Sequence, residues 1–249
     1  MSIGFQVEHH DRVGSTNDLA RERALAGAPE GLVVRADQQV AGRGRRGRAW
    51  ASPQGNLYCS LLLRPDCPPA MAATLSFATV IALGDVLSRL LPDSKIQHKW
   101  PNDLLIGGKK ISGILLEAGG AAGNKLDWLV IGLGVNIISH PEQALYPVTD
   151  LQAEGLAGML PADLLALFLE RFDPHYAAWK DGGFSALLPA WKSRAVGLGR
   201  DIQVRLEKQV LEGRFIDLDA DGTLMLKLAD GNIRRVTAGD VFLPTSSAN

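Results

Sequence analysis

The clearest structural signal in this chain lies in Lys99-Trp100-Pro101-Asn102-Asp103-Leu104-Leu105-Ile106-Gly107-Gly108-Lys109-Lys110-Ile111. Apolar residues flank a Gly-Gly pair, a pattern that predicts a β-hairpin with a two-residue turn. In that register Leu105 faces Lys110, and side-chain alternation places Asp103 and Lys110 on one face as diagonal neighbours. The hairpin therefore brings a carboxylate close to an ammonium group.

This Asp103–Lys110 pair has two interpretations. A carboxylate beside an ammonium group is a common structural ion pair. The same two groups suit nucleotidyl chemistry, in which an aspartate holds Mg²⁺ and a lysine meets a phosphate oxygen. The hairpin pattern by itself leaves both interpretations open.

Segments on either side of the hairpin predict a mixture of strands and helices. A helix is expected from Ser15 to Ala26, with Ser15 as its N-cap and Asp18 as a capping-box partner. Further helices are expected over residues 69–91, 161–179 and 184–194, and strands over 3–8, 31–37, 56–64, 95–100, 111–117 and 128–137. The fold class is therefore α+β, a mixed β-sheet with helices packed on it.

The character of the sequence changes after Gly199. Short alternating segments at 202–206, 211–218, 223–228 and 232–236 predict an all-β module. The module has roughly 50 residues, too few for an independent core, so we expect it to pack on the larger part. The expected domains are residues 1–196 and 197–249.

Composition limits the possible classes of protein. The chain has 249 residues, 46% of them hydrophobic and 21% charged, with a net charge of −1. These values exclude a wholly disordered or collagen-like chain, and they argue against a general nucleic-acid coat protein while allowing a local basic patch. No apolar run is expected to reach the roughly 20 residues of a membrane span, and residues 1–11 have no signal-peptide pattern. We expect a soluble, cytoplasmic protein with no membrane partner.

Cysteine and histidine give no sign of a metal or redox site. Cys59 and Cys67 lack the spacing of a metal knuckle or redox pair, so both are expected to be buried thiols. The five histidines are scattered without metal-ligand spacing.

An arginine-rich loop, Gly42–Arg48, matches the Gly-x-Gly-x-x-Gly pattern of dinucleotide-binding proteins. That interpretation fails because Pro53 and Gly55 interrupt and a strand follows where a helix is needed. Four arginines repel one another, so we expect a free loop to be mobile and to become ordered around an anion held by forked hydrogen bonds. A solvated basic loop is the alternative.

Two polar segments are candidates for ligand binding. Ser15-Thr16-Asn17 stands at a helix start, where it could simply cap the helix or hold a polar ligand group. Gly132-Leu133-Gly134-Val135-Asn136-Ile137 places glycines in an apolar strand, which indicates either a bulge or close approach of another backbone or a ligand. The Asn136 amide could contact a base edge.

Taken in this order, the segments resemble the biotin–protein ligases, also called biotin–[acetyl-CoA-carboxylase] ligases. The matching stretches are Ser15-Thr16-Asn17, Asp37-x-Gln39, Gly42–Arg48 with Trp50, Lys99–Asp103, Lys110-x-x-Gly113-Ile114-Leu115 and Gly132–Ile137. The similarity spans the whole chain, and it implies that the C-terminal module is a small SH3-like β-barrel.

The resemblance implies a two-step reaction with ATP and Mg²⁺ as cofactors. Biotin and ATP would give biotinyl-5′-AMP and pyrophosphate, and the biotinyl group would pass to a lysine of the biotin carboxyl carrier protein of acetyl-CoA carboxylase. The implied catalytic residues are Lys110, Arg45 and Asp103, with Asp103 also placing Mg²⁺.

The resemblance also implies binding residues. Biotin would contact Ser15, Thr16, Asn17, Gln39, Arg43, Gly44, Arg45, Lys110 and Gly113, and the nucleotide would contact Arg45, Arg48, Trp50, Lys99, Asn102 and Asn136. The first step brings two anions together, and unit charges about 4 Å apart repel by roughly 4 kcal/mol at an effective dielectric near 20. Arg45, Lys110 and Mg²⁺ would offset this repulsion, and the arginine-rich loop would exclude water from the reactive anhydride.

Two features depart from the family pattern. Some members carry an N-terminal helix-turn-helix, for which Ser15 lies too near the start, so we expect no repressor activity and no DNA partner. Members often stack an aromatic ring on adenine, and residues 138–150 offer only Tyr146. The alternatives are a ligase for another acyl acid such as lipoate and, outside enzymes, a nucleic-acid-binding module. A monomer or weak homodimer is expected.

Overall fold

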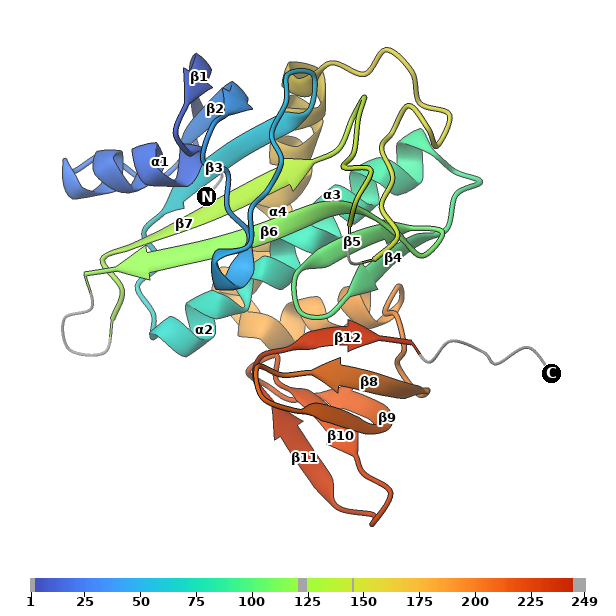
Figure 1. The fold of residues 1–249 in the computed structure, drawn as a ribbon. Helices are drawn as coiled ribbons and strands as arrows, with labels where there is room; N and C mark the ends of the chain where they lie inside the picture. The colour runs from blue at the N-terminus through green and yellow to red at the C-terminus, as the bar shows by residue number, and fades with distance from the viewer. Residues whose placement is uncertain (1–2, 121–124, 145, 244–249) are drawn as a thin grey trace.

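The computed structural model describes residues 3–120, 125–144 and 146–243 and contains two β-sheets (Figure 1). The large sheet has the strand order β1-β2-β3-β7-β6-β5-β4, and the C-terminal sheet has the order β11-β10-β9-β8-β12. The large-sheet strands are β1 (Gln6–Val13), β2 (Leu32–Gln39), β3 (Leu57–Leu63), β4 (Ile96–Lys99), β5 (Asp103–Ile106), β6 (Lys109–Gly119) and β7 (Trp128–Val135). The C-terminal strands are β8 (Asp201–Arg205), β9 (Val210–Leu218), β10 (Leu224–Lys227), β11 (Ile233–Val236) and β12 (Asp240–Phe242). The α+β fold class is confirmed.

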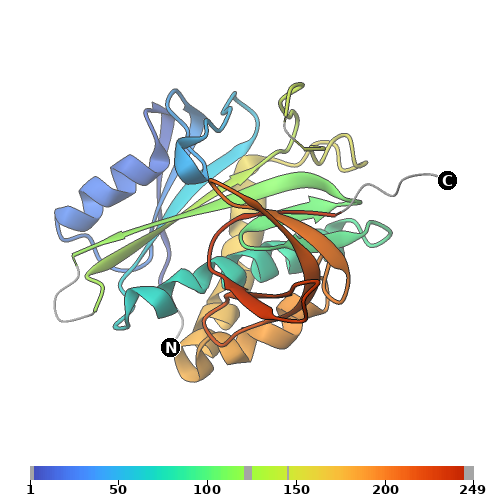
Figure 2. The ribbon, with the colours of Figure 1, turned by 60° about the horizontal axis from the view of Figure 1, so that its bottom comes forward.

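Helices cover the two faces of the large sheet unequally. The helices are α1 (Thr16–Leu25), α2 (Pro69–Ala73), α3 (Leu75–Leu90) and α4 (Pro161–Lys192). Figures 1 and 2 show α3 and α4 together on one face, where they form the main apolar core with the sheet. The shorter α1 packs on the opposite face over Val34, Leu62 and Val130. Most of that face is therefore left open for a site.

Strand β7 shows how the sequence assigns these faces. Leu129, Ile131 and Leu133 alternate into the main core, as the period of a strand requires. Trp128 and Val130 contact α1 on the other face, and Gly132 and Gly134 follow them there. Strand β7 is therefore buried on both faces near α1. Beyond α1, its residues on the same face as α1 are glycines.

The hairpin register predicted from the sequence is confirmed. Leu105 pairs with Lys110 across the turn, and Ile106 pairs with Lys109. The pairing then shifts between Leu104 and Leu105, so that Asp103 lies opposite Gly113. This bulge inserts one extra residue into β6 and was not predicted, because no local signal in the sequence marks it.

Several predicted helix features differ in the structure. The helix expected over 69–91 breaks at Thr74, whose hydroxyl group bonds the Met71 carbonyl and accepts the Trp179 indole N–H. The two helices expected over 161–179 and 184–194 join as α4, with a kink at Gly183. The capping box is wrong, because Ser15 makes no side-chain cap and Asp18 bonds Arg43 instead.

The expectation that no apolar segment reaches membrane-spanning length is also wrong. The helical segment Pro69–Leu90 has 22 residues, and an 18-residue window within it has a mean hydropathy of 1.8, so by length and composition it could cross a bilayer. Of that apolar window, 78% is buried inside the structure. Packing between the large sheet and α4 therefore accounts for its apolar character.

The C-terminal sheet packs on the larger part of the protein, against α3, α4 and the residue that follows β4, as expected for so small a module. The buried Trp100 indole N–H donates to the Gly222 carbonyl over 2.9 Å. Trp191 of α4 lies between Phe77 and Phe215, with ring centroids 5.4 and 6.5 Å away. Core residues of both sheets form one continuous cluster. Strand β12, the fifth strand of the C-terminal sheet, was not predicted from the sequence.

Candidate active site

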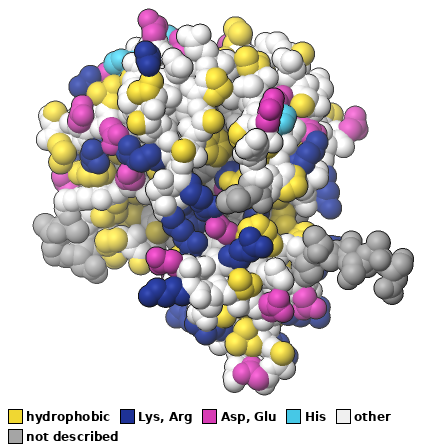
Figure 3. Space-filling model, viewed as in Figure 1, with side chains coloured by type: hydrophobic (Ala, Val, Ile, Leu, Met, Phe, Trp, Pro, Cys, Tyr) yellow, Lys and Arg dark blue, Asp and Glu magenta, His cyan; other side chains and the backbone are white. Residues whose placement is uncertain are grey.

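A cavity of about 640 Å³ opens on the face of the large sheet that α1 leaves uncovered. Figure 3 shows lysine and arginine side chains gathered around this hollow, between the large sheet and the C-terminal sheet. The residues singled out from the sequence all line it: Ser15, Thr16, Asn17, Gln39, Arg43, Gly44, Arg45, Arg48, Trp50, Lys99, Asn102, Asp103, Lys110, Gly113 and Asn136. Tertiary structure therefore brings motifs from across the chain into one place.

One end of the cavity is a network of neutral hydrogen-bonding groups. The Thr16 amide and hydroxyl groups both donate to Gln39 Oε1, over 2.8 and 3.1 Å. Gln39 Nε2 donates to Ser52 Oγ over 3.0 Å, and Ser60 Oγ lies 2.8 Å from Thr16 Oγ1 and 2.6 Å from Asn17 Oδ1. These side chains are fixed by one another rather than by capping α1, which favours the ligand-binding interpretation.

The glycines of β7 mark close approach rather than a bulge. A Cβ atom on Gly132 would lie 2.2 Å from Asn17 Oδ1, and one on Gly134 would lie 2.6 Å from Trp50 Nε1. Neither glycine has a positive φ, and β7 pairs with β3 and β6 in unbroken register. The approaching groups are therefore the side chains of Asn17 and Trp50, which need the space that glycine leaves.

The arginine-rich loop, Gly42–Arg48, is a small hairpin held by other parts of the protein. Its backbone closes through Gly44 N to Arg48 O at 2.7 Å and Trp50 N to Gly42 O at 2.9 Å. Arg43 makes two 2.7 Å hydrogen bonds to Asp18, and Arg48 contacts Asp240 at 2.9 Å. The carboxylates of Asp18 and Asp240 thus supply opposite charge to the loop, and the expected mobility of the free loop stays a prediction.

Arg45 differs from the other loop arginines. Its Nη1 group contacts the oxygens of Asn102 at 3.2 Å and Gly239 at 3.5 Å. Across the part of the chain that the structure describes, no carboxylate lies within ion-pair distance of Arg45, whereas Arg46 and Arg48 each have one and Arg43 has two. Burial lowers the pKa of Arg45 from its usual value, although a guanidinium stays charged at neutral pH. Arg45 can therefore bind an incoming anion.

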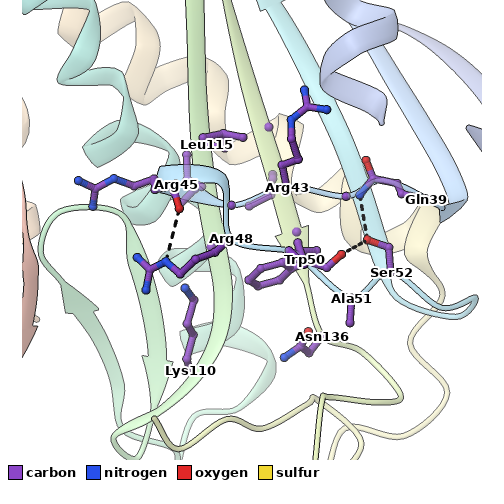
Figure 4. Close-up of a pocket in the computed structure, with 18 of the residues that line it drawn as sticks. Gln39, Arg43, Arg45, Arg48, Trp50, Ala51, Ser52, Lys110, Leu115 and Asn136 are labelled. Carbon is purple, nitrogen blue, oxygen red and sulfur yellow. Dashed lines mark hydrogen bonds between the residues drawn. The ribbon is translucent and has the colours of Figure 1, made fainter. Parts of the chain in front are cut away.

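Lys110 stands at the opposite end of the cavity from Gln39. Figure 4 shows Gln39 and Ser52 at one end, Arg48 and Lys110 at the other, and Trp50 between them. Lys110 Nζ lies 2.6 Å from Asp103 Oδ1, so the structural ion pair is present. Burial alone would lower the pKa of Lys110, but the Asp103 carboxylate and the Tyr146 hydroxyl outweigh it and raise the pKa. The ammonium group is therefore fixed and charged.

Lys99 is a second cation at this end. Its Nζ lies 5.2 Å from the ring centre of Tyr146 and 5.1 Å from that of Phe242 in β12. Burial lowers the pKa of Lys99, and within the described residues no carboxylate lies at ion-pair distance. Lys99 is thus held by aromatic rings and, like Arg45, can accept an anionic partner.

The two asparagines make bonds that fix the cavity wall. Asn136 Nδ2 donates to the Thr149 carbonyl over 2.9 Å, which fastens residues 147–151 to the end of β7. Asn102 Nδ2 donates to the Ile114 carbonyl. One of the two N–H donors of the Asn136 amide is therefore used within the protein, and the second N–H and the oxygen can contact a base edge.

Sequence analysis missed several groups in and around the cavity. Glu117 accepts a 2.6 Å hydrogen bond from Asn17 and lies 3.7 Å from Arg43. Glu117 and Gly113 are four positions apart on β6 and therefore lie on the same face of the strand. This spacing could have indicated that the Glu117 side chain points to the side of the sheet that carries the cavity. Asp240 belongs to the unpredicted β12, so no local signal connected it with the loop.

The structure also places one potential metal-ligand group outside the cavity. Ligand atoms of His9, Asp11 and Asp37 lie within 4.8 Å of one another on β1 and β2. Spacing along the sequence did not reveal the group, because Asp37 comes from the neighbouring strand. Both His9 and Asp11 are exposed, and His9 lies 3.0 Å from Asp37.

Comparison with known proteins decides the family. Residues 10–136 match the model of the biotin/lipoate A/B protein ligase family, and residues 197–243 match the biotin protein ligase C-terminal domain. This chain belongs to the biotin/lipoate A/B protein ligase family. The two matches together include both sheets and most of the cavity.

Individual relatives within this ligase family cover nearly the whole chain. The biotin–[acetyl-CoA-carboxylase] ligase of Paracoccus denitrificans is 36% identical over 93% of this chain and 98% of its own length. The bifunctional ligase/repressor BirA of Bacillus subtilis is 34% identical over 97% of this chain and 75% of its own length. The structure of the Aquifex aeolicus biotin protein ligase in complex with biotin and ATP aligns with a TM-score of 0.77 at 25% identity, covering 95% of this chain and 97% of that one.

Proposed function

We propose that this ligase-family protein activates biotin as biotinyl-5′-AMP and transfers the biotinyl group to a lysine of the biotin carboxyl carrier protein of acetyl-CoA carboxylase. The observation that carries the proposal is a single cavity with neutral hydrogen-bonding groups at one end and Arg45, Lys99 and Lys110 at the other. Biotin has this polarity, with a neutral ureido ring at one end and a carboxylate at the other. The relatives named above support the same reaction.

The neutral end would hold the ureido ring. Thr16, Asn17 and Gln39 provide donors and acceptors that the buried network already orients, and Ser15 lines the cavity beside them. Arg43 and Gly44, in the loop above, and Gly113, in the floor, complete the binding surface. Preorganised groups lose little conformational entropy when a ligand binds, which favours affinity for a small neutral ring.

The cationic end would hold the two reacting anions. The biotin carboxylate must approach the α-phosphate of ATP, and roughly 4 kcal/mol of repulsion opposes unit charges about 4 Å apart at an effective dielectric near 20. Lys110 would lie between the two groups, Arg45 would reach them from the loop, and Lys99 would meet other phosphate oxygens. Fixed cations at this point stabilise the charge that develops in the transition state.

The rest of the nucleotide would lie against Trp50, Arg48, Asn102 and Asn136. Trp50 Nε1 is buried without a hydrogen-bond partner among the described residues, so this ring is available for rearrangement when a ligand binds. The arginine-rich loop would cover the adenylate and exclude water, which protects a mixed anhydride from hydrolysis.

The residues of the cavity fit a magnesium ion. Asp103 lies at the cationic end, and one of its oxygens bonds Lys110 while the other can coordinate a metal. Mg²⁺ usually takes one or two protein carboxylates and completes its shell with water and phosphate oxygens. When bound, the ion would neutralise phosphate charge beside Lys110.

The direct test is incubation of the protein with biotin, MgATP and a biotin carboxyl carrier domain, followed by mass analysis. We expect a biotin-sized mass increase on one lysine and release of pyrophosphate. Lipoate in place of biotin serves as the control for the related ligase reaction. Modification with lipoate but not with biotin would show that lipoate is the substrate. Absence of pyrophosphate release with either acid would reject the ligase function.

Three further expectations belong to this proposal. We expect a cytoplasmic protein, a monomer or weak homodimer, and no sequence-specific DNA binding. A mobility-shift assay at physiological salt tests the last point, since weak binding through the arginine-rich loop should disappear as salt rises. Nanomolar, sequence-specific binding would contradict it.

A further inference from the structure

Glu117 lies on β6 beside the neutral end of the cavity. One of its carboxylate oxygens, Oε2, accepts a 2.6 Å hydrogen bond from Asn17 Nδ2. The other oxygen, Oε1, lies 3.7 Å from Arg43 Nη2, but Arg43 makes two 2.7 Å hydrogen bonds to Asp18. The carboxylate of Glu117 is therefore bonded mainly to Asn17.

Strand pairing fixes where this carboxylate stands. Strand β6 pairs with β7 in unbroken register, and Glu117 lies directly opposite Val130. Side chains of directly opposed residues share one face of the sheet, and Val130 is buried on that face against α1. Asn17 belongs to the first turn of α1. Glu117 therefore meets Asn17 from a rigid strand in the floor of the site.

The side-chain amide of Asn17 could take two orientations that fill the same space, because its oxygen and nitrogen are similar in size. A carboxylate accepts hydrogen bonds and cannot donate them, so only the orientation with Nδ2 toward Glu117 forms a bond at 2.6 Å. The Ser60 hydroxyl group, 2.6 Å from Asn17 Oδ1, can donate or accept and fits both orientations. Glu117 is thus the group that decides which way the amide faces.

The surroundings of Asn17 make this orientation matter. Asn17 is 4% exposed, and a Cβ atom on Gly132 would lie 2.2 Å from its Oδ1, so the amide has little room to turn away. Its second N–H and its oxygen border the cavity. A ureido ring carries a carbonyl acceptor between two N–H donors, and a reversed amide would leave a buried polar group unpaired.

We propose that Glu117 is a positioning residue for substrate recognition, which holds the Asn17 amide in the one orientation that matches a ureido ring. Asn17 lines the cavity whereas Glu117 stands behind it, so Glu117 acts through Asn17 rather than by touching the substrate. The proposal rests on the proposed function, because its ligand is biotin.

Isothermal titration of the full-length protein with biotin tests the proposal as a double-mutant cycle. Glu117→Met keeps a long side chain but removes the acceptor, and it should weaken biotin binding about tenfold. Glu117→Gln can donate as well as accept, so both orientations of Asn17 become available and the loss should be only about two- to threefold. In an Asn17→Ala background neither change should weaken binding further, because the amide that Glu117 positions is gone.

Glu212→Met is the matched control. Glu212 Oε1 accepts a 2.8 Å hydrogen bond from Gln203 Nε2, the same kind of bond, but in the C-terminal sheet. This variant should bind biotin as tightly as the wild type. The stoichiometry of the titration reports the folded fraction, so loss of folding would lower the stoichiometry and not the affinity.

Steady-state adenylate formation separates positioning from a general structural defect. Glu117→Met should raise KM for biotin about tenfold and leave kcat and KM for ATP unchanged, because the reacting groups meet at the other end of the cavity. Wild-type affinity in Glu117→Met, an equal loss in Glu212→Met, an undiminished loss in the Asn17→Ala background, or a fall in kcat at unchanged KM would each overturn the proposal. Absence of biotin binding by the wild type would instead reject the proposed function, and this proposal with it.

Discussion

Lys110 is oriented before any substrate arrives, because its surroundings fix it from three sides. Asp103 bonds its ammonium group, and the rings of Trp50 and Tyr146 lie 5.4 and 5.1 Å from it. A donor that is already in place needs no reorganisation when negative charge develops in the transition state. The ion pair is therefore compatible with the proposed catalytic role of Lys110, since it keeps the lysine charged at the edge of the cavity.

Replacing Lys110 with alanine should slow adenylate formation by about 10²–10³, the usual cost of removing one preorganised donor. Transfer from preformed biotinyl-5′-AMP should lose less, because no second anion approaches in that step. Lys110→Arg should rescue little, since a planar guanidinium does not reproduce the position of an ammonium group. Single-turnover measurement of each step checks this. A wild-type rate of adenylate formation would leave Lys110 as a structural partner of Asp103 only.

Gly132→Ala should weaken biotin binding by about tenfold or more. The added Cβ atom would lie 2.2 Å from Asn17 Oδ1, so the Asn17 side chain must move out of the buried network. Isothermal titration with biotin measures the effect. Gly4→Ala is the control, because nothing lies within 4 Å of a Cβ atom there. Equal affinity in the two variants would remove Asn17 from the binding site.

At the scale of elements, the arginine-rich loop and strand β4 each depend on partners distant in sequence. The loop depends on α1 and β12, as described above. In β4, the fully buried His98 lies with Nδ1 3.0 Å from the Trp191 carbonyl at the end of α4. Its Nε2 atom has no partner among the described residues and faces Gly84 of α3.

Binding of biotin should slow amide exchange in the arginine-rich loop beyond the protection that Asp18 and Asp240 already give. The reason is that a ligand beneath the hairpin stabilises the closed form by mass action. Hydrogen exchange with and without saturating biotin measures this. Equal exchange in both conditions would rule out a role of the loop as a cover for the ligand.

The stability of the protein should fall as pH decreases from about 6.5 to about 4, partly because of His98. Burial lowers the pKa of His98 from 6.5 to about 4, so between these values the unfolded chain binds a proton that the folded chain does not. The slope from this one group is at most about 1.4 kcal/mol per pH unit. Urea unfolding at several pH values should show a smaller slope for His98→Asn. An unchanged slope would assign the pH dependence to other groups.

At the scale of the whole molecule, the two sheets behave as one packed unit. Trp100, Trp191 and Phe215 join them through a shared core, and the pocket takes residues from both. The substrate cavity therefore depends on how the C-terminal sheet sits against the large sheet, and not only on residues of the larger part.

Phe215→Ala should lower the midpoint of a single unfolding transition rather than create an early separate one. Phe215 is fully buried in the shared core, and removing such a ring typically costs about 3–5 kcal/mol. Differential scanning calorimetry measures both the midpoint and the number of transitions. Ile233→Ala, on the exposed strand β11, is the control and should change the midpoint little. A separate early transition would show that the C-terminal sheet unfolds independently.

Local patterns in the sequence were sufficient to predict most of the strands and the types of residue at the site. The hairpin register followed from its glycine turn, whereas the glycines of β7 left a bulge and a close approach open until the structure placed Asn17 and Trp50 against them. The bulge in β6 and strand β12 could not be predicted in this way. Both depend on pairing with other strands, and β12 has only three residues. The same limit explains why Asp18 was assigned to a capping box instead of to Arg43.

The sequence by itself determined the fold class, the register of the hairpin and the ligase motifs, because alternation, turn residues and motif spacing act over a few neighbouring residues. Tertiary structure alone decided which acids pair with Arg43, Arg46 and Arg48 and how the motifs meet. Asp240 lies 192 residues from Arg48 along the chain, and only the packing of the C-terminal sheet brings the two together. A charged residue in the sequence indicates that a partner of opposite charge is needed. Which residue becomes that partner depends on the elements that the packing of the core places nearby.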